Sequence, residues 1–272
     1  MGDASIAKDA ADTKGRYVEA NGAELYYEER GTGAPLVLIH GGLVSSAMWE
    51  SLLPELIHEF RVITPDNRGH GRSTNPSGRL SYAQMADDVA AFIAALGLDR
   101  PVVCGYSDGG LVTLSLGVRH ADAAGALIVG AAHPYFERSV REYTRAFLGA
   151  DDDGTPDLAH VEANFGDQAG VVKSWHVGGE AQWRALVQQT APIWLDYEGP
   201  TADEVRTIDV PTLVLVGDRD EEWGRLDLMV SLYRALPRGE LGVCPCADHA
   251  SPLRRPLLGS MIGDFARRHA AT

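Results

Sequence analysis

The stretch Pro101-Val102-Val103-Cys104-Gly105-Tyr106-Ser107-Asp108-Gly109-Gly110 is the most informative about the fold of this 272-residue chain. Its first four residues predict a buried parallel strand, and a helix is expected to begin directly after Ser107. Between them the chain fits Gly-x-Ser-x-Gly, a pattern that places a serine on a sharp strand-to-helix turn. Because that turn is crowded, the residues two before and two after the serine must be small, and both are glycines. The stretch therefore predicts an α/β fold with Ser107 as a nucleophile.

Another register of the same turn would make Asp108 the nucleophile, as in dehalogenases. That register places the bulky Tyr106 at a crowded position, so Ser107 fits the turn better. An incidental serine in a glycine-rich turn would not require a strand before it and a helix after it.

A serine hydroxyl is a weak nucleophile at neutral pH, so a base must take its proton. His249 follows a short apolar strand that ends near Cys244, and it precedes the last predicted helix. This places it on a loop at the edge where open α/β sheets bind ligands. The other histidines fit less well, because they precede the candidate acid in the chain or lie near its C-terminus: His40, His70, His120, His133 and His269.

The carboxylate that orients the base should follow a strand and precede the histidine in the chain. Gly217-Asp218-Arg219-Asp220-Glu221-Glu222 offers two candidates. Asp220 is preferred, whereas Asp218 could cap the turn or pair with its arginine neighbour. The predicted strand before this one, residues 127–129, is followed by Ala131-Ala132-His133 and so by no aspartate or glutamate.

A tetrahedral oxyanion needs two backbone N–H donors. Asp108 supplies one from the start of its helix. The second is expected from the turn His40-Gly41-Gly42-Leu43, and from Gly42 in particular, since glycines let the backbone approach a substrate closely.

Alternation of apolar runs and helical patterns predicts a doubly wound sheet that begins antiparallel, over residues 24–30, and continues parallel. The clearest helix runs from Ser81 to Leu96, with a capping box from Ser81 to Gln84 and a stop at Gly97. The other predicted strands cover residues 36–39, 62–63, 127–129 and 213–216, and the last helix carries Leu258, Met261, Ile262 and Phe265 inward.

These motifs resemble, in order and interval, those of serine hydrolases with the α/β-hydrolase fold. The likeness runs from about Tyr17 to the C-terminus and rests on His40-Gly41, Asp66-x-Arg68-Gly69-His70-Gly71-Arg72-Ser73, the Ser107 turn, Gly217-x-x-Asp220 and His249. It implies a mostly parallel sheet with a small helical cap, catalysis without a metal or organic cofactor, and Asp220 as the acid. On this basis we expect a loose tail over residues 1–15, a core of residues 16–132 and 209–272, and a cap of residues 133–208.

Asp108 departs from the apolar residue that many members of the family carry after the serine. It resembles the Ser-Asp-Gly-Gly turn of some amino-acid-ester hydrolases, of the valacyclovir hydrolase type. Its carboxylate would pair with a cationic group on a substrate, or it would stabilise the N-terminus of the following helix. The sequence leaves both interpretations open.

Aromatic residues collect in the predicted cap, and some are expected to face the pocket although most should pack the cap itself. The candidate substrate contacts are Gly41, Leu43, Tyr106, Asp108, Trp175, Trp183 and Trp194.

A formal net charge of −14 disfavours nucleic acid and anionic membranes as partners. The odd number of cysteines (Cys104, Cys244 and Cys246), in or beside apolar runs, predicts reduced core thiols and a cytoplasmic protein. We expect a monomer or homodimer that acts on a small molecule.

The expected reaction is hydrolysis of a carboxylic ester, or of a lactone, through an acyl-serine. A carbon–carbon bond hydrolase of the same fold remains an alternative, as does a ligand receptor with little turnover. Perhydrolase or haloperoxidase chemistry is expected only as a side activity.

Overall fold

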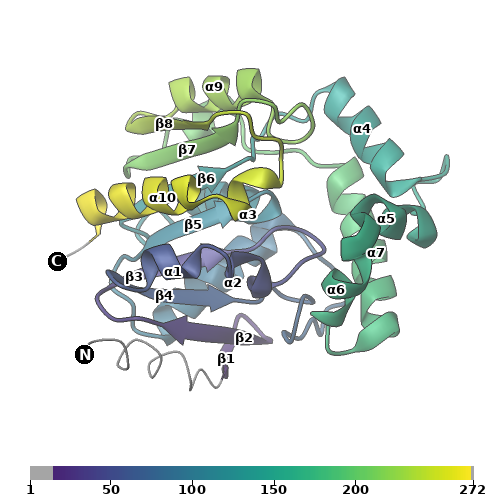
Figure 1. The fold of residues 1–272 in the computed structure, drawn as a ribbon, viewed down its shortest axis with the longest axis horizontal. Coiled ribbons are helices and arrows are strands. Elements are labelled where there is room, and N and C mark those ends of the chain that lie inside the picture. Colours follow the sequence, from purple (N-terminus) through teal and green to yellow (C-terminus); the bar gives the residue numbers. More distant parts are fainter. Residues whose placement is uncertain (1–14, 271–272) are drawn as a thin grey trace, which may run out of the picture.

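Eight strands form one sheet in the computed structural model, which describes residues 15–270 (Figure 1). Their order is β1-β2-β4-β3-β5-β6-β7-β8, with β1, β2 and β4 paired antiparallel and the rest parallel. The strands are β1 (Arg16–Ala20), β2 (Ala23–Arg30), β3 (Ala34–Ile39), β4 (Phe60–Pro65), β5 (Val102–Tyr106), β6 (Ala126–Gly130), β7 (Thr212–Gly217) and β8 (Gly239–Cys244). The predicted change from antiparallel to parallel pairing is confirmed. The sequence did not indicate β1, a short edge strand in which Tyr17 is exposed.

Three adjacent strands of the sheet, β5, β6 and β7, are buried along their whole length. This explains their unbroken apolar sequences, because both faces of a parallel sheet are covered by helices. In the parallel register Gly105 pairs with Ile39 and Val129, and Tyr106 pairs with Gly130. The carboxyl ends of β3, β5 and β6 therefore meet at one edge of the sheet.

Helices cover both faces. Side chains of α2 (Tyr82–Ala95), α3 (Asp108–Arg119) and α9 (Leu226–Ala235) join one hydrophobic cluster, and those of α1 (Leu53–Leu56) and α10 (Pro256–His269) join another. Ser81 Oγ accepts from the Gln84 backbone N–H at 3.1 Å. Only this half of the predicted capping box is present among the described hydrogen bonds.

The chain between β6 and β7 contains helices and no strand over residues 131–211, all of them described. The helices are α4 (Arg138–Leu148), α5 (Leu158–Phe165), α6 (Ala169–Ser174), α7 (Gly179–Leu195) and α8 (Ala202–Val205). Figure 1 shows α4 to α7 grouped to one side of the sheet. We call residues 133–208 the cap segment; its definition as a separate domain stays a prediction.

Two further expectations concern the termini and the thiols. The predicted N-terminal tail lies outside the described residues, apart from Gly15. Cys104 and Cys244 are buried free thiols as expected, but Cys246 is exposed on a turn with φ of 52°, so core packing is wrong for that residue. Within residues 15–270, none of the helices combines the length and the apolar character needed to span a bilayer.

Candidate active site

Ser107 stands on the turn between β5 and α3 with a positive φ of 56°. Its backbone N–H donates to the carbonyl of Gly130 on the neighbouring strand at 2.8 Å. A Cβ on Gly105 would lie 1.9 Å from the carbonyl oxygen of Gly109, and one on Gly109 would lie 2.1 Å from that of Ile39. These collisions explain why the turn has glycine on both sides of the strained serine.

His249 connects Ser107 with Asp220. Its Nε2 lies 3.0 Å from Ser107 Oγ, and its Nδ1 lies 2.7 Å from Asp220 Oδ2. Because a carboxylate only accepts, Nδ1 carries a proton and Nε2 of the neutral ring is free to accept one from the serine. Asp218 instead accepts from the Ala247 N–H at 3.0 Å, so the geometry favours Asp220 over Asp218.

Opposing effects set the pKa of His249. Burial of the ring lowers this pKa, but the hydrogen bond and negative charge of Asp220, together with the charges of Glu222 and Asp108, raise it by a larger amount. The pKa of His249 therefore lies above its ordinary value. Imidazolium formed during a reaction would be stabilised here.

Two aromatic residues hold the loop and the ring of His249. The Tyr106 hydroxyl donates to the carbonyl oxygen of His249 at 2.8 Å. Trp223 packs edge-on against the imidazole, with 5.2 Å between ring centroids, and its indole N–H donates to Thr144 Oγ1 on α4. Trp223 was not predicted from the sequence, although its place three residues after Asp220 was a signal that it borders the site.

Backbone N–H groups of Gly42 and Asp108 have no hydrogen-bond partner in the described part of the chain. His40 Nδ1 donates to the Gly41 carbonyl at 2.7 Å, and its Nε2 accepts from the Asn67 N–H at 2.8 Å. The Gly41 carbonyl and the Gly42 N–H belong to one peptide unit, so His40 fixes the direction of that N–H. Two donors are thus free beside Ser107, as an oxyanion requires.

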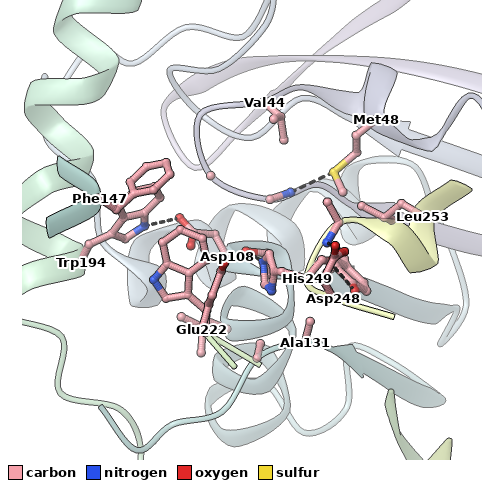
Figure 2. A pocket seen from close by; sticks show the side chains of 18 of the residues that line it. Val44, Met48, Asp108, Ala131, Phe147, Trp194, Glu222, Asp248, His249 and Leu253 are labelled. Atoms are coloured by element: carbon pink, nitrogen blue, oxygen red, sulfur yellow. Dashed lines mark hydrogen bonds between the residues drawn. The ribbon is translucent and has the colours of Figure 1, made fainter. Parts of the chain in front are cut away.

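A cavity of about 370 Å³ opens beside these groups (Figure 2). Much of its wall is apolar, and three carboxylates, of Asp108, Glu222 and Asp248, also line it. Among residues 15–270, no lysine or arginine lines the cavity. Its apolar lining includes Val44, Met48, Leu111, Phe136, Phe147, Phe165, Trp194, Trp223 and Leu253.

Asp108 faces this cavity with its carboxylate. Figure 2 shows the indole N–H of Trp194 directed at it, and the N–H donates to Asp108 Oδ2 at 2.8 Å. Burial raises the pKa of Asp108 to about 6. A Cβ on Gly42 would lie 2.4 Å from the same carboxylate oxygen, so the oxyanion turn, the carboxylate and the cap segment meet at this point.

Four of the seven predicted substrate contacts line the cavity: Gly41, Tyr106, Asp108 and Trp194. The other three predictions are wrong. Leu43 is fully buried in the core, and so is Trp183, whose indole N–H donates to Glu162 at 3.1 Å. Trp175 is half-buried and packs against the same core cluster.

Comparisons with known proteins agree with this architecture. The sequence model of the alpha/beta hydrolase family matches residues 36–258. A putative non-heme chloroperoxidase from Synechocystis sp. is 28% identical over 249 residues, or 84% of this chain and 88% of that protein. A 2-hydroxy-6-oxo-6-(2'-aminophenyl)hexa-2,4-dienoic acid hydrolase from Metapseudomonas resinovorans is 30% identical over 220 residues, or 76% and 74% of the two chains. The solved structure of a thermophilic esterase from Thermogutta terrifontis has a TM-score of 0.73 at 25% identity, covering 94% of this chain and 100% of that one.

Proposed function

The chain belongs to the alpha/beta hydrolase family, and from this premise we propose that it is a serine hydrolase that cleaves a small-molecule carboxylic ester. The observation that carries the proposal is the hydrogen-bonded series Ser107, His249 and Asp220, with two free backbone N–H groups beside it. This is the arrangement that acyl transfer requires. The proposed occupant is a small molecule, bound by a monomer or homodimer.

The reaction proceeds through an acyl-serine. Ser107 Oγ attacks the ester carbonyl while His249 Nε2 takes the hydroxyl proton, and the N–H groups of Gly42 and Asp108 donate to the oxyanion. The C–O bond to the alcohol breaks, and His249 gives its proton to the leaving oxygen. Water then attacks the acyl carbonyl while His249 takes a proton from the water. The bond between the acyl carbon and Ser107 Oγ breaks, His249 returns the proton to Oγ, and the acid leaves. Asp220 holds the imidazole and stabilises its charged form.

The cavity supports a neutral or cationic ester over an anionic substrate. Its apolar and aromatic wall suits a small hydrophobic acyl or alcohol group. The solved esterase supports the same reaction class, and a lactone, which is a cyclic ester, is the second substrate class.

A carbon–carbon bond hydrolase is the alternative, supported by the relative from Metapseudomonas resinovorans. The name of that relative specifies an acid, which carries a carboxylate at neutral pH. Asp108, Glu222 and Asp248 would repel such a substrate, and no lysine or arginine of the described chain lines the cavity to pair with it. The charge of the lining thus favours the ester over the dienoate.

Asp108 is proposed to contact a cationic group on the ester. The carboxylate lines the cavity, and its side chain accepts from Trp194 rather than from the N–H groups of its own helix. Its position supports recognition of an amino group more than a role restricted to the helix terminus.

Turnover with matched substrate panels tests the proposal. We expect wild type to hydrolyse p-nitrophenyl esters or lactones in preference to a meta-cleavage-type dienoate, and Ser107→Ala to lose at least about 10³-fold in kcat. Preference for the dienoate would establish the alternative. Folded protein that turns over neither panel would point to a ligand receptor.

A further inference from the structure

His176 links the cap segment to two loops at the carboxyl edge of the sheet. It lies between α6 and α7 and is only 2% exposed. Its Nδ1 accepts from the Gly71 N–H at 3.0 Å, and its Nε2 lies 3.1 Å from the Leu43 carbonyl oxygen. Since an amide N–H only donates and a carbonyl only accepts, the ring is neutral with its proton on Nε2. Burial lowers the pKa of His176 and so favours this neutral form.

Leu43 holds an unfavourable conformation next to Gly42. Its φ is 59°, in the left-handed region, and its side chain is 0% exposed. A non-glycine residue in this region is strained and persists only where its surroundings hold it. The described contacts that hold Leu43 are its buried side chain and the hydrogen bond from His176 to its carbonyl.

Gly71, the other hydrogen-bond partner of His176, lies in a tightly packed loop. Gly71 has a φ of 53°, and a Cβ there would lie 2.0 Å from Asp66 Oδ2. The Asp66 carboxylate accepts from the N–H groups of Ser46 and Arg72, both at 2.9 Å, at the end of β4. His176 is therefore anchored on one loop of the sheet edge and donates to the other.

We infer that His176 is a positioning residue for the oxyanion donor Gly42. On the core side, the hydrogen bond from His40 fixes the peptide unit that carries the Gly42 N–H. On the side of the cap segment, the hydrogen bond from His176 fixes the next residue, Leu43. Without the His176 donor, the Leu43 carbonyl is left buried and unpaired, and relaxation of its φ redirects the chain after Gly42. The inference rests on the proposed function, because it concerns the oxyanion of that reaction.

Two substitutions separate the two hydrogen bonds of the ring. In His176→Gln the side-chain amide nitrogen can take the place of Nε2 and keep the bond to Leu43, whereas in His176→Asn the side-chain amide oxygen can take the place of Nδ1 and keep the bond to Gly71. We expect His176→Asn to lower kcat about 10- to 100-fold with KM within about twofold, because oxyanion donors act in the transition state. We expect His176→Gln to stay within about threefold of wild type, on the same reasoning.

Gln182→Leu is the matched control. Gln182 Nε2 donates to the carbonyls of Gly69 and Gly71 at 3.1 Å, so it joins the cap segment to the same loop, and none of its described hydrogen bonds involves Leu43. We expect its thermal midpoint to fall while kcat is unchanged.

Distinct outcomes test the inference and the function on which it rests. Absence of both ester turnover and fluorophosphonate labelling in wild type would defeat the proposed function. With wild type active, unchanged kcat in His176→Asn would overturn the positioning role, as would an equal loss of kcat in Gln182→Leu. Should His176→Asn fail to fold, a tenfold loss of kcat in folded His176→Gln would also overturn it.

Discussion

Asp220 accepts a hydrogen bond from His249 through Oδ2, at 2.7 Å, while its Oδ1 accepts from the backbone N–H of Gly224 at 3.1 Å. A Cβ on Gly224 would lie 2.2 Å from that carboxylate, so the loop after β7 closes tightly around the acid. The carboxylate is buried and held from both sides. Its orientation determines which nitrogen of His249 carries the proton.

Asp220→Asn should leave the fold intact and lower kcat by about 10³- to 10⁴-fold, because an amide N–H can stabilise the wrong imidazole tautomer. Steady-state ester hydrolysis measures the effect. Asp218→Asn is the control, since its side-chain oxygen can still accept from Ala247. Equal losses in the two variants would contradict the assignment of Asp220.

The activity should depend on the neutral form of His249. Because Asp220 and the nearby carboxylates raise the pKa of His249, kcat/KM should fall as the pH decreases, with a midpoint above the ordinary histidine value of about 6.5. Glu222→Gln removes one of these charges and should move the midpoint to lower pH. A pH–rate profile that does not move, or moves upward, would show that Glu222 does not act on His249.

Asp108→Asn should reduce the preference for amino-bearing esters over neutral esters by about 10-fold, if the carboxylate pairs with the substrate cation. The comparison uses kcat/KM for matched ester pairs that differ in the amino group. Asparagine keeps an oxygen for the Trp194 N–H, which limits structural change. An unchanged ratio would eliminate the pairing and leave a role at the helix terminus.

Acid should destabilise the fold through its buried histidines. Burial lowers the pKa of His40 to about 3 and that of His133 to about 4, and it also lowers the pKa of His70 and His176. Their contribution is fully present above the unfolded value of about 6.5 and is lost as the pH falls from there through the folded values. Asp108 opposes this: its raised pKa of about 6 favours the fold at low pH, and that contribution is lost as the pH rises through 6.

Urea unfolding between pH 7 and pH 4 measures the balance. We expect the free energy of unfolding to fall over this range, since four histidines with lowered pKa values outweigh Asp108 and His249, whose raised pKa values act in the opposite direction. His176→Gln should make the decline shallower, because one buried imidazole is removed. Constant stability over the range would contradict the neutral histidine core.

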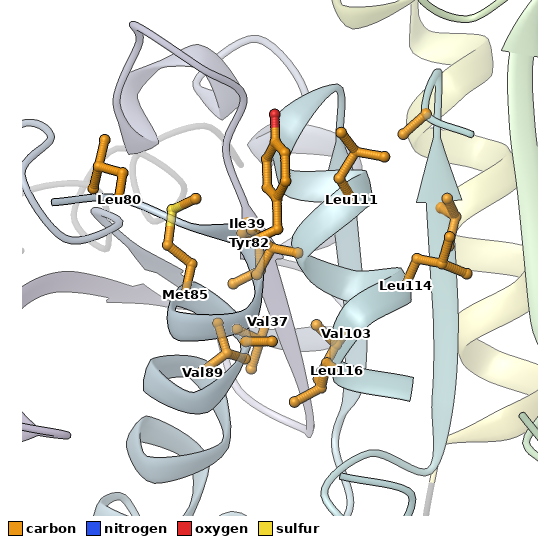
Figure 3. Packing of buried hydrophobic residues seen from close by; sticks show 14 of the residues in the cluster. Val37, Ile39, Leu80, Tyr82, Met85, Val89, Val103, Leu111, Leu114 and Leu116 are labelled. Carbon is orange, nitrogen blue, oxygen red and sulfur yellow. The ribbon is translucent and has the colours of Figure 1, made fainter. Parts of the chain in front are cut away.

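Much of the fold could be predicted because its signals are local. The apolar stripe of α2 carries Tyr82, Met85 and Val89, and Figure 3 shows these side chains among the buried residues that also include Val37 and Leu111. The glycines around Ser107 were equally informative, since each collision at that turn involves residues close in the chain or on the next strand.

The rest of the site could not be predicted, because it depends on how distant segments pack. Trp183 and Trp194 lie on one helix, yet Trp183 packs inside the cap segment and Trp194 reaches Asp108. No periodicity distinguishes the two rings. Similarly, Leu43 has a positive φ, and its hydrogen-bond partner His176 lies 133 residues away in the chain.

Labelling with a fluorophosphonate probe, followed by mass mapping of the modified peptide, tests whether Ser107 is an activated nucleophile. We expect one adduct, on Ser107, that is absent in Ser107→Ala and forms more slowly in Asp220→Asn. Folded wild-type protein that takes no label, or takes it at another residue, would contradict the assignment of Ser107 as an activated nucleophile.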